Sequence, residues 1–489
     1  MSIRDLFLRR LEELAVQFAA RPAVVAEGHV ATFGALWQAA SQVAAFLVGE
    51  GVQPGDRLGL LGVKTVHDFE HLLGIWLAGA AYVPLNHKFP PARNRGILFA
   101  AGARGVLAGP RSDALAKEIS GTAGASVPGG ASTYHRLPAQ LVAGANEETD
   151  TADLAYIIFT SGSTGAPKGV PITFGNLAAY LANLQAAYPA SARDRVAQLA
   201  DLSFDASVHE IALSWSIGAT LYVVPAAGAL MWPRYAQEHH VTSMLVVPSA
   251  VLLAARAGLL APASLPALRL AFVGAETVTP EVVRTMHAAA PHAQVVNIWG
   301  LTESTVLFTH FAVDRAKPIP DPVPIGLPFA GQQMKLRDGE IVQTGSQLMS
   351  GYWRNPEANH ERFLDEDGQR WFRTGDLARF DAALGYIFLG RRDRQVKVRG
   401  YRVELPECEA AIRSVSGFDQ VAVVLVADRL ACFVAGPTVV DAAALKSELK
   451  KRLPDYMVPA SFEQLEEMPL GATGKTDYSA LAQRAQVQR

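Results

Sequence analysis

Cysteine is scarce in this chain, because Cys408 and Cys432 are the only two cysteines in 489 residues. Their spacing fits neither a zinc site nor a Cys-x-x-Cys redox pair. A small secreted domain held together by disulfides would need far more cysteine, so that class is excluded. We expect both residues to be structural thiols in a reducing compartment.

An excess of charge of either sign is also lacking. Lysine and arginine number 44 and aspartate and glutamate 46, so the formal net charge is −2, too little positive charge for a nucleic-acid-binding surface. No run of eighteen or more apolar residues occurs, as a membrane-spanning helix would require. The N-terminus lacks the apolar core and cleavage site of a signal peptide. We therefore predict a cytoplasmic protein that binds neither nucleic acid nor a membrane.

Up to about residue 390, apolar strand-like runs alternate with Ala/Leu-rich helical stretches, such as 67–80 and 176–188. This alternation predicts an α/β fold with layered, largely parallel sheets. Residues 108–150 contain few large apolar side chains and are predicted to form surface structure. The strand candidates are 58–61, 81–84, 154–160, 196–199, 220–224, 243–247 and 268–273.

The composition changes twice toward the C-terminus. Residues 322–390 combine short strand-like runs with many glycines and aromatic residues, which predicts an antiparallel or barrel-like β portion. From Arg391 the chain is more polar and has enough helix and strand signals for a separate α+β unit. We predict a large N-terminal domain over 1–390, a hinge over 391–394 and a small mobile domain over 395–489.

The most informative stretch is 156–170, where an apolar strand leads into a loop of hydroxyls and glycines. Glycines let backbone N–H groups turn toward an anion, and a lysine adds positive charge. The spacing of a Gly-Lys-Ser/Thr phosphate loop is absent. A flexible linker is the alternative, but a linker rarely follows a buried strand. The predicted phosphate-binding residues are Thr160, Ser161, Gly162, Ser163, Thr164, Gly165 and Lys168.

This loop resembles the phosphate loop of the adenylate-forming superfamily, which includes acyl-CoA synthetases, luciferases and the adenylation domains of nonribosomal peptide synthetases. Further motif matches follow in the right order over most of residues 30–480. The resemblance implies a ligase that uses ATP and Mg²⁺ to convert a carboxylic acid into an acyl-adenylate.

A second match is Asn297-Ile298-Trp299-Gly300-Leu301-Thr302-Glu303, at the end of a short apolar strand. Ligands of open α/β sheets bind at such strand ends. The residues alone leave core packing open for Trp299 and a helix-terminal charge open for Glu303. The resemblance implies that Asn297, Trp299 and Gly300 contact the nucleotide, with Trp in place of the usual Tyr. It also implies catalytic roles for Thr302 and Glu303, with Glu303 as a Mg²⁺ ligand.

Four more residues are assigned by resemblance near the domain boundary and the C-terminus. Asp376, in a Thr-Gly-Asp turn, matches the ribose-binding carboxylate, and Arg391 is expected to contact the ribose or phosphate. Asp393 matches the hinge residue. Lys475, in a glycine-flanked loop, matches the catalytic lysine that neutralises charge as the adenylate forms. A solvated linker and an ordinary surface lysine are the alternatives.

Asp205 bears on which acid is activated. It lies in Phe204-Asp205-Ala206-Ser207-Val208, which is similar to the peptide-synthetase pattern whose aspartate pairs with the substrate's α-ammonium group. Acyl- and aryl-CoA ligases have no such charge to pair, so Asp205 favours an amino acid over uncharged acids. A helix N-terminal role is the alternative. The other predicted substrate-binding residues are Ala206, His209, Ser249, Ala271, Val273, Gly274, Ile298, Val306 and Leu307.

The predicted substrate residues are mostly apolar, and they do not identify the amino acid. His209 occupies a position where tryptophan is common, and a packing role is favoured slightly over a hydrogen bond to the substrate. The chain ends 14 residues after Lys475 without a carrier motif, so we expect a free-standing enzyme. It would transfer its product to the phosphopantetheine of a separate carrier protein, in nonribosomal peptide and antibiotic biosynthesis. The sequence leaves open whether a small helper protein is needed. Two alternative functions also stay open: an acyl- or aryl-CoA ligase, and a nucleotide-binding protein without catalysis.

Overall fold

The computed structural model describes residues 2–128, 132–138, 153–162, 167–225, 230–366, 368–436, 441–470 and 476–487. The chain divides into two compact units. The large unit comprises Met1–His87, Leu98–Phe159 and Gly169–Arg392, and the small unit comprises Lys88–Ile97, Thr160–Lys168 and Asp393–Arg489. The division after Arg392 falls within the predicted hinge. However, two short segments from the predicted N-terminal domain, Lys88–Ile97 and Thr160–Lys168, belong to the small unit.

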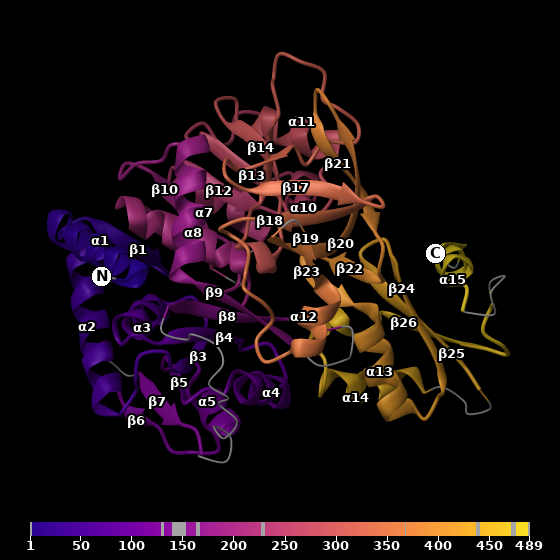
Figure 1. Cartoon of the computed structure of the whole chain (residues 1–489), viewed down its shortest axis with the longest axis horizontal. Coiled ribbons are helices and arrows are strands. Elements are labelled where there is room, and N and C mark those ends of the chain that lie inside the picture. Colours follow the sequence, from indigo (N-terminus) through magenta and orange to yellow (C-terminus); the bar gives the residue numbers. More distant parts are fainter. Residues whose placement is uncertain are drawn as a thin grey trace. The chain divides into compact units, whose positions relative to one another are not determined.

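Among the described residues, a nine-stranded sheet forms one layer of the large unit (Figure 1). Its five central strand pairs are parallel and its outer pairs antiparallel. Most residues of the central strands are buried and apolar, as expected for strands covered on both faces. The order is β16 (Leu327–Pro328), β15 (Thr309–Ala312), β14 (Gln294–Trp299), β13 (Leu270–Gly274), β12 (Ser243–Val246), β10 (Arg195–Gln198), β11 (Thr220–Val223), β1 (Pro22–Ala26) and β2 (His29–Thr32).

A second sheet has seven strands among the described residues, and its central pairs are also parallel. It includes two strands from the stretch predicted as surface structure, and Tyr134 of that stretch is buried. That prediction was therefore wrong for part of 108–150. The order is β6 (Ala125–Ser126), β7 (Thr133–Arg136), β5 (Gly105–Ala108), β3 (Arg57–Gly62), β4 (Ala81–Asn86), β8 (Leu154–Thr160) and β9 (Lys168–Thr173).

The main hydrophobic core joins the two sheets, since its buried residues come from both sheets and from six of the described helices. Five of these are α1 (Ile3–Gln17), α2 (Phe33–Gly49), α3 (Val66–Leu77), α7 (Phe174–Ala187) and α8 (Asp205–Ile217), and the sixth is α12 (Pro356–Arg362). A second core lies on the other face of the nine-stranded sheet. It contains side chains of α9 (Trp232–Glu238), α10 (Pro248–Arg256) and α11 (Pro280–Ala289). Among the described residues before 300, the remaining α-helices are α4 (Pro91–Ala101) and α5 (Asp113–Ser120).

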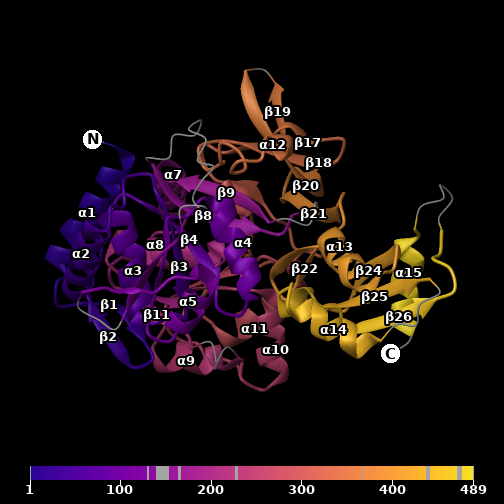
Figure 2. The same cartoon turned by 90° about the horizontal axis from the view of Figure 1, so that it is seen from below.

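An antiparallel sheet completes the large unit, and both views show its strands grouped with helix α12 (Figure 2). Five of its strands are described. They agree with the β portion predicted over 322–390. The elements are β17 (Gln333–Arg337), β18 (Glu340–Thr344), α12 (Pro356–Arg362), β19 (Phe363–Glu366), β20 (Gln369–Asp381) and β21 (Gly385–Arg391).

The small unit has the predicted α+β composition. Alternate residues of β24 face two separate cores, because Val423 packs in one core and Val424 in the other. Helices α13 and α14 contribute to the first core and α15 to the second. The elements are β22 (Gln395–Val398), β23 (Tyr401–Glu404), α13 (Leu405–Ser416), β24 (Gln420–Val426), β25 (Arg429–Ala435), α14 (Ala442–Lys450), η3 (Asp455–Met457), β26 (Ser461–Leu465) and α15 (Tyr478–Val487).

The predicted fold class is confirmed, because every strand candidate listed from the sequence overlaps a strand of the large unit. Cys408 and Cys432 are both buried and unbridged, in agreement with structural thiols. In the part of the chain that the structure describes, each helix is too short or too polar to reach across a bilayer.

Burial of His71 in α3 predicts acid sensitivity. Burial lowers the pKa of His71 to about 3 from an ordinary value of 6.5, so the folded protein binds fewer protons than the unfolded chain between these values. The free energy of unfolding should therefore fall as pH falls below about 6.5, by about 2 kcal/mol for this group between pH 7 and 5.

Urea unfolding of the native protein and of His71→Leu at pH 7 and pH 5 measures this contribution. The substitution should reduce the acid-induced loss, and His360→Leu, at an exposed position of α12, is the matched control. An equal loss in all three proteins would contradict the prediction.

Candidate active site

Trp299, Asp376 and Arg391 are brought together at the end of β14. Trp299 is the last residue of that strand, and its indole Nε1–H donates a hydrogen bond to Asp376 Oδ2 at 2.9 Å. The other carboxylate oxygen of Asp376 accepts a hydrogen bond from the Arg391 guanidinium. Both Trp299 and Asp376 are buried. The structure thus links three residues that the sequence assigned to the nucleotide, and it identifies Trp299 as a hydrogen-bond donor.

Glu303 lies just beyond this strand, in the short helix η2 (Thr302–Ser304). Its carboxylate is fully buried, and Oε1 accepts a hydrogen bond from the Tyr352 hydroxyl at 2.8 Å. The Glu303 carbonyl accepts a hydrogen bond from the Met349 N–H at 2.8 Å. Tyr352 was missed from the sequence, because nothing local distinguishes it from a core aromatic.

The described residues contain no group of three or more His, Cys, Asp or Glu side chains that could hold a metal ion. A Mg²⁺ ion that accompanies a nucleotide needs only one or two protein carboxylates, because the phosphates and water supply the other ligands. The carboxylate of Glu303 fits that limited role, and Thr302 precedes it in the same helix.

The backbone after Glu303 is strained. Thr305 and Val306 have φ values of 57° and 70°, in the left-handed region that β-branched residues avoid. Such residues cost about 1–3 kcal/mol each and persist only where the surroundings fix them. Both Val306 and Leu307, predicted substrate residues, are buried in this loop.

Asp205 is the first residue of α8 and is half-buried. The helix N-cap is Phe204, so Asp205 does not itself cap the helix. Burial raises the pKa of Tyr180 well above its usual value, and the Asp205 charge adds to the rise. Burial also raises the pKa of Tyr82 and Tyr156, and the Asp205 charge adds to the rise in both. Asp205 therefore lies near three buried tyrosines from β4, β8 and α7, and Ala206 follows it in the helix.

His209, one turn further along α8, is fully buried and packs against two aromatic rings. Its Nδ1 lies 2.6 Å from the Tyr180 hydroxyl, and its ring meets Phe272 edge-on at a centroid distance of 5.3 Å. Burial lowers the pKa of His209 to about 3, so the ring is neutral near pH 7. Its Nε2 has no hydrogen-bond partner among the described residues. Tyr180 was not predicted from the sequence.

Strand β13 presents Phe272, and not its neighbours, toward His209. Ala271 and Val273 belong to the second core, with α10 and α11, whereas Phe272 and Ile298 belong to the main core. Because side chains alternate along a strand, a shift of one residue exchanges the two faces. The structure thus separates Ala271 and Val273 from His209. Gly274 lies on the Phe272 face, where a Cβ atom would come within 2.4 Å of Ile298.

Two other predicted residues are engaged in local structure. Ser249 donates from its backbone N–H and its hydroxyl to the Glu276 carboxylate, at 2.8 and 2.9 Å. The Asn297 amide donates to the carbonyl of Pro324 at 2.7 Å. The side chain of Asn297 thereby holds the segment that leads into β16.

The predicted phosphate loop is described only at its ends. Thr160 donates to the Lys168 carbonyl at 3.4 Å, and Lys168 is buried. Ser161 donates to the Arg402 carbonyl at 2.9 Å, and the Gly162 N–H donates to the Glu407 carboxylate at 3.3 Å. The Gly162 N–H therefore already faces an anion. Ser163, Thr164, Gly165 and the predicted catalytic Lys475 lie outside the described residues.

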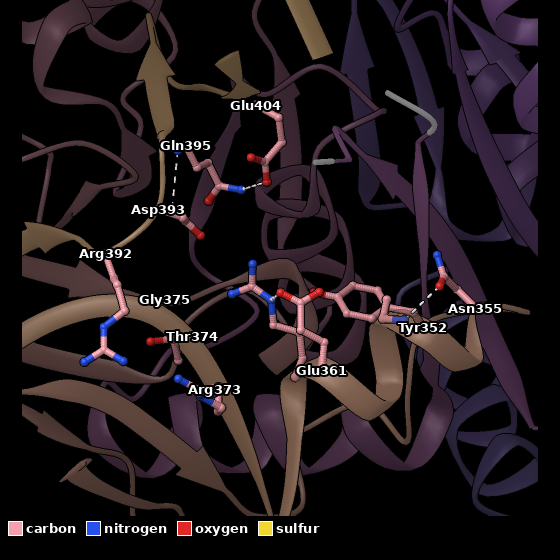
Figure 3. Close-up of polar contacts among 12 residues, drawn as sticks. Tyr352, Asn355, Glu361, Arg373, Thr374, Gly375, Arg392, Asp393, Gln395 and Glu404 are labelled. Carbon is pink, nitrogen blue, oxygen red and sulfur yellow. Dashed lines mark hydrogen bonds and ion pairs between the residues drawn. The ribbon is translucent and has the colours of Figure 1, made fainter. Parts of the chain in front are cut away.

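Asp393, the predicted hinge residue, begins a small polar chain within the small unit (Figure 3). Its carboxylate accepts a hydrogen bond from the Gln395 N–H at 3.3 Å. The Gln395 amide in turn donates to the Glu404 carboxylate at 2.5 Å. Gln395 thus joins both strands of the β22–β23 hairpin to the residue just after the unit boundary.

Comparison with protein families gives two matches in chain order. Residues 11–353 match the model described as "AMP-binding enzyme", and residues 407–475 match the model described as "AMP-binding enzyme C-terminal domain". The chain is 35% identical over 492 residues to a linear gramicidin synthase of Brevibacillus parabrevis. That alignment covers 92% of the chain but only 6% of the synthase polypeptide, so the chain spans a small part of this relative.

Two solved structures are similar over nearly the whole chain. One is the Vibrio cholerae adenylation domain AlmE in complex with glycyl-adenosine-5'-phosphate, with a TM-score of 0.87, 27% identity, and coverage of 99% of this chain and 98% of AlmE. The other is PA1221, a nonribosomal peptide synthetase protein containing adenylation and PCP domains. It has a TM-score of 0.80, 27% identity, and coverage of 98% of this chain and 84% of PA1221.

The packing at Gly300 allows a direct test of the strained loop. A Cβ atom at this position would lie 2.1 Å from the Val306 carbonyl oxygen, so the loop has no room for a side chain. Gly300→Ala should lower the free energy of unfolding by about 1–3 kcal/mol through overpacking. Gly49→Ala at the end of α2 is the matched control, because a Cβ there meets nothing within 4 Å. Chemical denaturation that gave equal stability for both variants would refute the packing argument.

Proposed function

Because this chain belongs to the AMP-binding enzyme family, as its motifs indicated, we propose that it activates an amino acid as aminoacyl-AMP with release of pyrophosphate. The family match makes it an adenylate-forming ligase. The observation that carries the choice of an amino acid is Asp205, a carboxylate among buried tyrosines at the start of α8. A substrate ammonium group can form an ion pair with this carboxylate, whereas an uncharged acid cannot.

The similar proteins support the same choice. The AlmE structure holds glycyl-adenosine-5'-phosphate, an aminoacyl adenylate, and the PA1221 protein joins an adenylation domain to a PCP domain. We therefore propose that the second reaction transfers the aminoacyl group to the phosphopantetheine thiol of a separate carrier protein, in nonribosomal peptide biosynthesis. The acyl- or aryl-CoA ligase alternative is not favoured by these relatives or by Asp205.

The chemistry requires no nucleophile from the protein, because the substrate carboxylate itself attacks the α-phosphate of ATP. The protein's contribution is to position the reactants and to stabilise charge. The Asp376 carboxylate would accept hydrogen bonds from the ribose hydroxyls, while hydrogen bonds from Trp299 and Arg391 hold it in place. Glu303 would hold Mg²⁺, which supplies positive charge to the phosphates. Lys475 would stabilise the charge that develops as the adenylate forms, with Asp393 as the hinge residue.

The proposed acyl site lies within the large unit. Asp205 would bind the ammonium group, and the apolar side chains of Phe272, Ile298, Val306 and Leu307 would surround the rest of the substrate. His209 is neutral and fixed by Tyr180, so it would contribute shape and at most one polar nitrogen. These features favour a small or medium side chain without charge.

Substrate-dependent ATP–pyrophosphate exchange tests the proposed function. The panel comprises proteinogenic amino acids, β- and imino acids, and several fatty and aryl acids. We expect exchange with an amino acid, and we expect Asp205→Ala to reduce its kcat/KM at least a hundredfold, because the ammonium group loses its partner. Asp201→Ala serves as a nearby acidic control. Exchange confined to acids without an amine, or an unchanged Asp205→Ala enzyme, would refute the amino acid assignment.

The Trp299–Asp376 hydrogen bond predicts a nucleotide-specific effect. Hydrogen bonds to charged groups contribute about 1.5–3 kcal/mol, so Trp299→Phe should raise the KM for ATP about tenfold or more. The KM for the amino acid should change much less. Discrimination between ATP and 2'-deoxy-ATP should also weaken, because Asp376 is held less firmly. Steady-state kinetics with both nucleotides measure this, and equal increases in both KM values would argue for a general packing defect instead.

A further inference from the structure

Gln347 lies outside the motifs that the sequence singled out, yet its side chain is completely buried. Its amide Nε2 donates to the Leu307 carbonyl at 2.8 Å and lies 3.4 Å from the Ser304 carbonyl. The Thr305 hydroxyl donates to the Gln347 carbonyl at 2.6 Å. Gln347 therefore bonds both ends of the segment that contains the two left-handed residues, Thr305 and Val306.

Gln347 is itself held from the other side by helix α7. The Asn183 amide donates to Gln347 Oε1 at 2.8 Å. One face of α7 also carries Asn176, whose amide donates to the carbonyls of Ser346 and Leu348 at 2.8 and 3.0 Å. Both atoms of the Gln347 amide thus have fixed partners, so its donor nitrogen can point only toward the strained segment.

We propose that Gln347 is a positioning residue that, together with Asn183, fixes the backbone of Thr305–Leu307 and thereby sets the selectivity of the acyl site. The inference rests on the proposed function, which takes Val306 and Leu307 as substrate-contacting residues. Gln347 does not touch the substrate itself. A backbone in the left-handed region reverts toward ordinary conformations when its restraints are removed, and this would move both side chains.

The test compares Gln347→Met, which keeps the length of the side chain without its hydrogen bonds, with Gln343→Met. Gln343 is the matched control, since it is also fully buried but its amide has no hydrogen-bond partner within the described residues. Asn183→Ala is the second variant, because Asn183 is partly exposed and its loss removes the hydrogen bond to Gln347 Oε1. All three variants are made in the full chain.

The first readout is ATP–pyrophosphate exchange. The substrates are glycine, L-alanine, L-2-aminobutyrate, L-norvaline, L-norleucine and β-alanine. We expect Gln347→Met to reduce the kcat/KM ratio between the best substrate and its next homologue at least fivefold, with the KM for ATP within twofold of the native value. Asn183→Ala should change the ratio in the same direction but less. If the kcat/KM ratio of Gln347→Met equals that of the native enzyme, the proposal is overturned.

The second readout is hydrogen–deuterium exchange of peptides that cover residues 301–309, and it requires no activity. Gln347→Met should lose at least tenfold in protection there, whereas Gln343→Met should not. If the native enzyme activates no amino acid, the proposed function fails, and this measurement still decides whether Gln347 holds the loop. Unchanged protection in Gln347→Met and Asn183→Ala would refute the positioning role.

Discussion

The pairing of Trp299 with Thr309 is the constraint on which the site depends. These residues end β14 and begin β15 in antiparallel register, so the chain between them must leave the sheet and return within a short distance. Glu303, Val306 and Leu307 all lie in that loop. Part of the loop backbone is satisfied within the loop, but three of its carbonyls accept hydrogen bonds from residues outside it. These carbonyls belong to Glu303, Ser304 and Leu307.

The partners of those carbonyls come from distant parts of the chain, and this gives α7 its importance. Asn176, Tyr180 and Asn183 are spaced by four and three residues, so they lie on one face of the helix. Tyr180 fixes His209, while Asn183 fixes Gln347. A single polar face of α7, with one buried and two half-buried side chains, thus supports two separate walls of the proposed acyl site. Rigid support of this kind makes a site selective.

The sequence predicts the large elements well for a physical reason, since strands buried on both faces appear as continuous apolar runs. The same property hides which face of β13 reaches the site, because Ala271, Phe272 and Val273 are all apolar. Strand β7 was missed because it is short and follows a glycine-rich stretch. Gln347 could not be found, because its role depends on carbonyls some forty residues away, and no local pattern records such a contact.

Tryptophan at position 299, in place of the usual tyrosine, changes the hydrogen bonds that this side chain can make. An indole N–H can only donate a hydrogen bond, whereas a hydroxyl can donate or accept. Trp299 therefore requires an acceptor, and the Asp376 carboxylate supplies one at Oδ2. Each carboxylate oxygen has two lone pairs, so a hydrogen bond from Trp299 or Arg391 orients the group without exhausting its capacity. The ribose hydroxyls would then meet a carboxylate whose direction is already fixed, and less conformational entropy would be lost when the nucleotide binds.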